Sequence, residues 1–240
     1  MPSPEIALGR PRVHLRRIDS TNDRACLLAI AGAPHGTLVT ASSQTAGRGR
    51  QGRRWSSPAG QSLLMSLLLR RPVSDRSPSL LPLIAAVAVC DVAGNDARIK
   101  WPNDIVLPHA NGLAKLAGIL AEGRPQEGWA VLGIGLNVAV QLEELPLELR
   151  TGAATLGYRP NAIEPTLEQL LVALQRRLAE PAAATLQAWR LRDALYGREI
   201  AWHSGRGHAE GIDGTGRLIV ALAGGGHTTL QAGEVHLDVG

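Results

Sequence analysis

The stretch from residue 116 to residue 138, LAGILAEGRPQEGWAVLGIGLNV, holds two apolar runs separated by a polar segment that contains a proline. Each run, residues 116–121 and residues 130–138, has the length and apolar content of a buried strand. Further runs look like strands at residues 37–41, 62–69 and 104–107. This repetition predicts a β-sheet at the centre of the chain.

Helical patterns flank these strands. The polar sequence DSTND at residues 19–23 precedes an apolar segment, which predicts a helix capped by Ser20 or Thr21. Residues 80–92 have the length and the Ala/Leu content of a buried helix, with Pro82 in its first turn. Leucines recur at helical spacing at positions 167, 170, 171, 174 and 178, so we expect an amphipathic helix that covers one face of the sheet.

The pattern changes after residue 197. Short strand-like runs cover residues 199–202, 217–222 and 228–231, and glycine-rich turns such as Asp213-Gly214 separate them. We therefore expect an α+β fold, with a mixed sheet covered by helices in residues 1–195 and a small β-barrel in residues 196–240.

Composition sets limits on the class of protein. Of the 240 residues, 45% are hydrophobic and 19% are charged, which is typical of a packed globular chain. Cys26 and Cys90 lie in apolar, helix-like segments, so buried structural thiols are expected rather than a disulfide or a metal site.

Residues 1–17 lack the apolar region of a signal peptide, and the apolar stretch of residues 80–89 is too short to span a bilayer. We expect a cytoplasmic protein.

A basic loop carries much of the local charge. Residues 47–55 read GRGRQGRRW and contain four arginines, whereas the whole chain has a net charge of +4. Glycines let a backbone approach a ligand, and arginines supply charge and fork-shaped donors, so the loop suits a phosphate or a carboxylate. It is not a Walker loop. The alternatives are a solvated basic loop and a nucleic-acid-binding tract, although Trp55 and the strand that follows favour a folded loop.

Three more segments carry candidate polar groups. In KWPND, residues 100–104, Pro102 disfavours helix before it and leaves Asn103 at the start of a strand, although the segment also suits a plain turn. Lys115 precedes the apolar run of residues 116–120 and is either a charge at a strand end or a cation aimed at a phosphate. Glycines at positions 133 and 135 weaken a strand interior unless something approaches the backbone closely.

Five segments, taken together, closely resemble the biotin–protein ligase family. The arginine loop and the Lys-Trp-Pro-Asn-Asp segment are very specific to that family, and the other three fall in its order and approximate spacing. The stretch from Gly211 to Val235, through Gly233-Glu234, also looks like the family's small SH3-like domain. Ser43 replaces a common acidic residue, and the chain contains no phenylalanine. The five segments are Ser20-Thr21-Asn22, Gln44-Thr45-Ala46 with the arginine loop, residues 100–104, residues 115–120 and residues 133–137.

The resemblance implies a catalytic domain of the biotin ligase type, which is similar to class II aminoacyl-tRNA synthetases, followed by an SH3-like β-barrel. It implies an ATP-dependent ligase that forms biotinyl-AMP from biotin and Mg-ATP and transfers biotin to a lysine of a biotin carboxyl carrier protein domain. Mg²⁺ would accompany ATP, and no metal site of the protein's own is expected. Because only about nineteen residues precede Ser20, we expect the monofunctional type, without sequence-specific DNA binding, as a monomer or homodimer.

The resemblance also implies roles for individual residues. The biotin site would comprise Ser20, Thr21, Asn22, Gln44, Gly47, Arg48, Gly49, Arg50, Lys115, Gly118, Gly133 and Gly135. The ATP site would comprise Arg50, Arg53, Trp55, Lys100, Asn103 and Asn137, with Trp55 stacked on adenine. The catalytic group would comprise Lys115, Arg48, Arg50, Arg53 and Asp104.

Charge explains why such a site needs cations. Two anions, the biotin carboxylate and the α-phosphate, have to meet, and Lys115 is the first choice for contacting both. A loop of glycines and like charges is expected to be mobile until ligands order it.

A lipoate–protein ligase or acyltransferase is the close alternative, and the arginine loop favours biotin. A nucleic-acid-binding module is the distant alternative, which the scarcity of aromatic residues disfavours.

Overall fold

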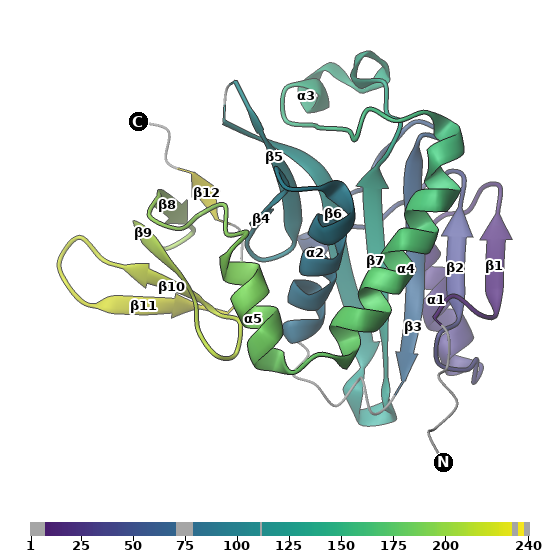
Figure 1. Ribbon diagram of the computed structural model, residues 1–240, viewed down its shortest axis with the longest axis horizontal. Helices are drawn as coiled ribbons and strands as arrows, with labels where there is room; N and C mark the ends of the chain where they lie inside the picture. Colours follow the sequence, from purple (N-terminus) through teal and green to yellow (C-terminus); the bar gives the residue numbers. More distant parts are fainter. Residues whose placement is uncertain (1–7, 71–78, 111, 232–234, 238–240) are drawn as a thin grey trace.

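A seven-stranded mixed sheet forms the centre of the computed structural model, which describes residues 8–70, 79–110, 112–231 and 235–237 (Figure 1). The strand order is β1-β2-β3-β7-β6-β5-β4, with β1 parallel to β2 and every other neighbouring pair antiparallel. The mixed sheet predicted from the apolar runs is thus confirmed. The strands are β1 (Arg12–Leu15), β2 (Leu38–Ala41), β3 (Ser62–Arg70), β4 (Arg98–Lys100), β5 (Asp104–His109), β6 (Gly112–Arg124) and β7 (Trp129–Asn137).

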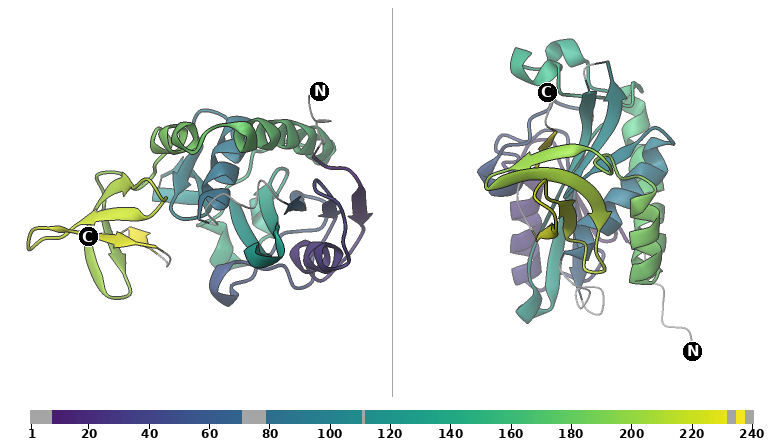
Figure 2. Two further views of the ribbon diagram at one scale, coloured as in Figure 1. Left: turned by 90° about the horizontal axis from the view of Figure 1, so that it is seen from below. Right: turned by 90° about the vertical axis from the view of Figure 1, so that its left-hand side faces the viewer.

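Helices cover both faces of this sheet. One face carries α2 (Leu80–Ala93) and α4 (Ile163–Ala179), with α5 (Ala182–Arg190) packed against α2, and the other carries α1 (Thr21–Ile30) (Figure 2). In α4, the leucines at positions 167, 170, 174 and 178 are buried, which confirms the amphipathic helix. In α2, every residue from 83 to 90 is buried, so this helix forms the middle of the main core.

Shorter helical segments join these elements. They are the 3-10 turns η1 (Arg50–Gly52), η3 (Pro125–Glu127), η4 (Leu142–Glu144) and η5 (Pro160–Ala162), and the one-turn helix α3 (Leu147–Arg150). None of the helices in the described ranges is long and apolar enough to cross a membrane.

A separate antiparallel sheet forms the C-terminal region. Its strands, in the order β11-β10-β9-β8-β12, are β8 (Glu199–Trp202), β9 (Gly205–Ile212), β10 (Leu218–Ala221), β11 (His227–Leu230) and β12 (His236–Leu237). The described strands of the expected β-barrel form an open sheet, because β11 and β12 are its two edges and do not pair with each other. β12 holds only two residues and pairs with β8 alone. Gly233 and Glu234 lie outside the described residues.

The turn between β9 and β10 anchors this second sheet on the first. The indole Nε1 of Trp101 donates a hydrogen bond of 3.1 Å to the carbonyl of Gly216, and the Ser79 hydroxyl donates one of 2.8 Å to the carbonyl of Thr215. Gly216 has a φ of +85°, and a Cβ there would lie 2.6 Å from Leu83 on α2. The turn therefore requires glycine, and it rests beside the KWPND segment.

Candidate functional site

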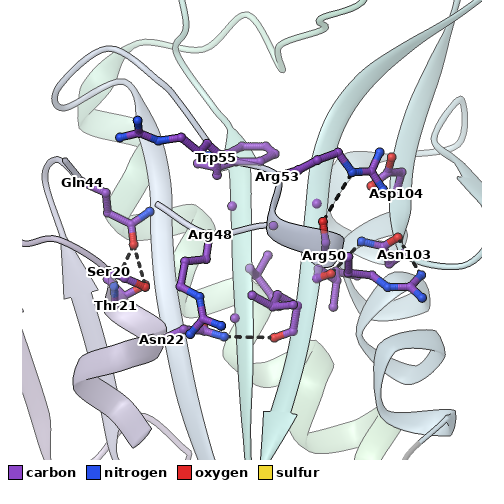
Figure 3. Close-up of a pocket in the computed structure, with 18 of the residues that line it drawn as sticks. Ser20, Thr21, Asn22, Gln44, Arg48, Arg50, Arg53, Trp55, Asn103 and Asp104 are labelled. Carbon is purple, nitrogen blue, oxygen red and sulfur yellow. Dashed lines mark hydrogen bonds between the residues drawn. The ribbon is translucent and has the colours of Figure 1, made fainter. Parts of the chain in front are cut away.

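The predicted segments meet in one cavity of about 110 Å³ on the α1 side of the sheet (Figure 3). Its wall combines the start of α1, the arginine loop and the middle of β6 and β7. Residues predicted for the site that line this cavity are Ser20, Thr21, Asn22, Gln44, Arg48, Gly49, Arg50, Arg53, Trp55, Asn103, Asp104, Lys115, Gly118, Gly133 and Gly135.

The first turn of α1 supplies a polar wall. The Ser20 hydroxyl accepts a hydrogen bond of 3.3 Å from the backbone N–H of Asp23, so Ser20 is the predicted cap. The backbone N–H and the hydroxyl of Thr21 lie 2.7 and 3.0 Å from Oε1 of Gln44. Gln44 therefore joins the segment before the arginine loop to the start of α1.

Sequence reasoning missed Ser66, which lies beneath this wall. Its hydroxyl is 2.6 Å from Oδ1 of Asn22 and 2.9 Å from Oγ1 of Thr21, and its side chain is fully buried. Buried polar groups need partners, so a lone serine in the apolar run LLMSLLL is the signal that could have found it.

The glycines of β7 make room over the sheet. A Cβ on Gly133 would lie 2.0 Å from Oδ1 of Asn22, and a Cβ on Gly135 would lie 2.5 Å from Cε2 of Trp55. A Cβ on Gly118 of β6 would lie 3.1 Å from the same indole. The close approach inferred from these glycines is therefore confirmed, and the groups that approach are side chains of the protein itself.

The arginine loop is a folded hairpin-like turn. The N–H of Gly49 donates to the carbonyl of Arg53 at 2.7 Å, and the N–H of Trp55 donates to the carbonyl of Gly47 at 2.9 Å. Gln51, at the apex, has a φ of 55°, in the left-handed region that non-glycine residues rarely adopt. The expectation of a folded loop is met, and its mobility without ligands remains a prediction.

The arginines of this loop differ in their partners. Arg48 pairs with the carboxylates of Asp23 and Glu122. Partial burial alone would lower the pKa of Arg48, yet the hydrogen bond to Asp23 and the charge of Glu122 raise it. Arg50 donates to Oδ1 of Asn103 at 3.3 Å. The charge of Arg48 is therefore balanced by carboxylates of the protein, an arrangement that the sequence did not indicate.

Lys115, Trp55 and Asp104 lie at one end of the cavity. The Nζ of Lys115 is 2.7 Å from Oδ1 of Asp104 and 5.7 Å from the centre of the Trp55 ring. Lys115 and Trp55 also line a second cavity of about 220 Å³, together with Asn137 and residues of α3. Asn137 is fixed there by Nδ2, which donates to the carbonyl of Ala154 at 2.9 Å.

Two residues predicted for the site are absent from the described lining of both cavities. The first is Lys100, which lies in β4. Gly47 lies behind the wall, where a Cβ would be 2.5 Å from the Trp55 carbonyl and 2.8 Å from Nε2 of Gln44. Its part in the site is to allow close packing of the loop. Within the described ranges, no three His, Cys, Asp or Glu side chains gather as metal ligands.

Comparison with known proteins places this geometry in a family. A model of the biotin/lipoate A/B protein ligase family matches residues 14–138, just over half of the chain. A biotin–[acetyl-CoA-carboxylase] ligase from Paracoccus denitrificans is 35% identical over 242 residues, which cover 92% of this chain and 98% of the relative. The bifunctional ligase/repressor BirA from Bacillus spizizenii is 42% identical over 157 residues, which cover 62% of this chain. The match spans about half, 47%, of that relative's length.

Solved structures agree with the sequence comparison. The biotin protein ligase from Aquifex aeolicus in complex with biotin and ATP superposes with a TM-score of 0.78 at 25% identity, covering 95% of this chain and 98% of that one. The likeness thus extends over both sheets and is not confined to the segment that the family model matches. On these matches in sequence and in structure, the chain belongs to the biotin/lipoate A/B protein ligase family.

Proposed function

We propose that this protein is an ATP-dependent biotin–protein ligase. The observation that carries the proposal is the convergence of a polar wall, a cationic loop and an aromatic ring on one cavity. The similar Aquifex aeolicus protein was solved with biotin and ATP, which supports both ligands for this fold.

We assign biotin to the first cavity. Its ureido ring needs a few placed donors and acceptors within a mainly apolar wall. Thr21, Asn22 and Gln44 supply the polar groups, and Met65 and Ile134 are among the apolar lining residues. Gly49, in the wall of this cavity, lets the backbone of the loop approach the ligand.

The nucleotide is assigned to the second cavity. Trp55 lines it with an indole ring, and Asn137 adds a polar group fixed by two hydrogen bonds. Because Lys115 lines both cavities, its ammonium group can reach the biotin carboxylate and the α-phosphate together.

The proposed chemistry proceeds in two steps. A carboxylate oxygen of biotin attacks the α-phosphorus of Mg-ATP, the bond to the β-phosphate oxygen breaks, and biotinyl-AMP and pyrophosphate form. The amine of an acceptor lysine then attacks the acyl carbon, AMP leaves, and an amide remains. Lys115, Arg50 and Arg53 stabilise the negative charge of the first transition state, and Asp104 positions Lys115.

The acceptor is proposed to be the biotin carboxyl carrier domain of a carboxylase, as the name of the Paracoccus relative suggests. We assign residues 1–195 to the catalytic domain and residues 196–240 to a small C-terminal domain. The Trp101–Gly216 hydrogen bond joins these two parts next to the proposed site.

The test is direct. Incubation with biotin, ATP and Mg²⁺ should yield biotinyl-AMP and pyrophosphate, detected by mass spectrometry, and an added carrier domain should then gain biotin on one lysine. Biotin should raise the melting temperature, whereas lipoate should not. Adenylate formation with lipoate and none with biotin would contradict the proposal and favour the lipoate branch of the family.

A further inference from the structure

Glu122, near the end of β6, touches two parts of the site that are far apart in the sequence. Its Oε2 accepts a hydrogen bond of 2.9 Å from Nδ2 of Asn22, on α1. Its Oε1 accepts one of 2.6 Å from Nη2 of Arg48, in the arginine loop. One carboxylate therefore connects the polar wall to the arginine loop.

The first of these contacts fixes the orientation of an amide. Nδ2 of Asn22 faces Glu122 and the carbonyl of Leu120, and Oδ1 faces the Ser66 hydroxyl. Asn22 is 5% exposed, so a rotated amide would leave buried groups unpaired. Glu122 and Ser66 together decide which atom of Asn22 faces the cavity.

The second contact fixes the loop. Arg48 is held between Glu122 and Asp23, and the Glu122 side chain is 26% exposed. Exposed single ion pairs contribute little to stability. This carboxylate, however, bonds two partners at once, and charge-assisted hydrogen bonds of this length are stronger than neutral ones.

We propose that Glu122 is a positioning residue that couples closure of the loop at residues 47–55 to the orientation of Asn22. It acts through Asn22 and Arg48 and does not itself touch the reacting atoms. In this role, Arg48 holds the loop in place, while Lys115, Arg50 and Arg53 are the cations that the proposed function assigns to the substrate charges. The contacts of Glu122 with the loop do not depend on the proposed function, whereas the expected effect on biotin binding rests on it.

Replacing Glu122 with Gln keeps the shape of the side chain and removes its charge. Both partners of Glu122 are donors, so one of them loses its acceptor to the new amide NH2 group, and in either orientation Arg48 loses its charged partner on β6. We expect faster hydrogen–deuterium exchange in residues 47–55 of the ligand-free protein. We also expect the KM for biotin to rise about tenfold, the equivalent of about 1.4 kcal/mol, with kcat changed less than threefold.

Glu127→Gln is the matched control. Glu127 lies in the same hairpin and is 44% exposed, but its partners are Arg124, at 2.9 Å, and Nε1 of Trp129, at 3.0 Å, and include neither Asn22 nor Arg48. Its loss should leave both the exchange of residues 47–55 and the KM for biotin unchanged.

Arg48→Gln breaks the same contact from the loop side. If the coupling is real, this variant resembles Glu122→Gln, and the double variant is no worse than the more damaged single one. It also takes over the test if Glu122→Gln does not fold.

Unchanged exchange and an unchanged KM in Glu122→Gln would overturn the proposal. So would a large fall in kcat at constant KM, because Glu122 would then act in the chemistry. A wild-type protein that makes no biotinyl-AMP would instead refute the proposed function, while the exchange of residues 47–55 would still decide whether Glu122 holds the loop.

Discussion

Lys115 and Asp104 form an ion pair, with Nζ of the lysine 2.7 Å from Oδ1 of the aspartate. The two residues come from neighbouring antiparallel strands, where a register shift between Ile105 and Val106 interrupts the regular pairing of β5 with β6. The lysine is thereby held at the junction of the two cavities before any substrate arrives. Such preorganised charge is what a transition state between two anions requires.

Lys115→Ala should therefore remove catalysis far more than binding. We expect kcat for adenylate formation to fall by about 100-fold or more, because a preorganised cation is lost from the transition state. The dissociation constant for biotin, from calorimetry, should change only a few-fold.

Lys100→Ala provides the comparison, since the chain contains only these two lysines. Lys100 is absent from the described lining of both cavities, so Lys100→Ala should lower kcat for adenylate formation clearly less than Lys115→Ala does. Equal losses for the two lysines would contradict the role assigned to Lys115.

Gly135→Ala should disturb the aromatic wall. The added Cβ would lie 2.5 Å from Cε2 of Trp55, so the indole has to move. Because we assign adenine to the face of Trp55, we expect the KM for ATP to rise about tenfold, with a smaller change for biotin. Steady-state kinetics with each substrate varied in turn measures both.

Gly214→Ala is the control for this change. A Cβ on Gly214 has no neighbour within 4 Å, and its φ lies outside the left-handed range. Normal kinetics for Gly135→Ala would show that the ring can shift without affecting the nucleotide.

Apolar periodicity indicates the sheet, because it is a local signal, whereas most of the lining residues were expected from the resemblance to the family. The sequence does not indicate Glu122, which meets Asn22 across 100 positions and lies just beyond the matched segment of residues 115–120. For a related reason, the sequence does not indicate that the described strands of the C-terminal β-barrel form an open sheet. Short strands and glycine turns predict antiparallel pairing, whereas closure depends on whether the two edge strands meet.

Ser66→Ala tests a residue that only the structure reveals. The change removes the hydroxyl that lies 2.6 Å from Oδ1 of Asn22 and leaves a buried acceptor without that donor. We expect the free energy of unfolding to fall by about 1–3 kcal/mol, measured by urea denaturation, and biotin to bind more weakly. Ser66→Thr keeps the hydroxyl and should restore biotin binding in part; binding equal to that of Ser66→Ala would argue against the hydrogen bond.

Asp193 gives stability a dependence on pH. It lies between α5 and β8, where its Oδ1 accepts from the N–H of Leu195 at 2.8 Å and its Oδ2 is buried without a hydrogen-bond partner among the described residues. Burial raises the pKa of Asp193 from 3.8 to about 6. The folded protein therefore holds the proton of the Asp193 carboxyl group more tightly than the unfolded chain does. As a result, the free energy of unfolding falls as pH rises between about 4 and 6.

Asp193→Asn should remove this penalty. At pH 7.5 we expect the free energy of unfolding to rise by about 1–2 kcal/mol, and the gain should vanish near pH 4.

Asp213 supplies the opposite case: burial favours a higher pKa, but hydrogen bonds from Arg217 and Thr215 outweigh it and hold the pKa well below its usual range. Asp213→Asn should therefore destabilise the protein at neutral pH, with a loss that shrinks as pH falls below about 4. Urea denaturation at several pH values measures both, and a gain for Asp193→Asn that stays constant from pH 4 to 7.5 would show that the carboxylate does not titrate in this range.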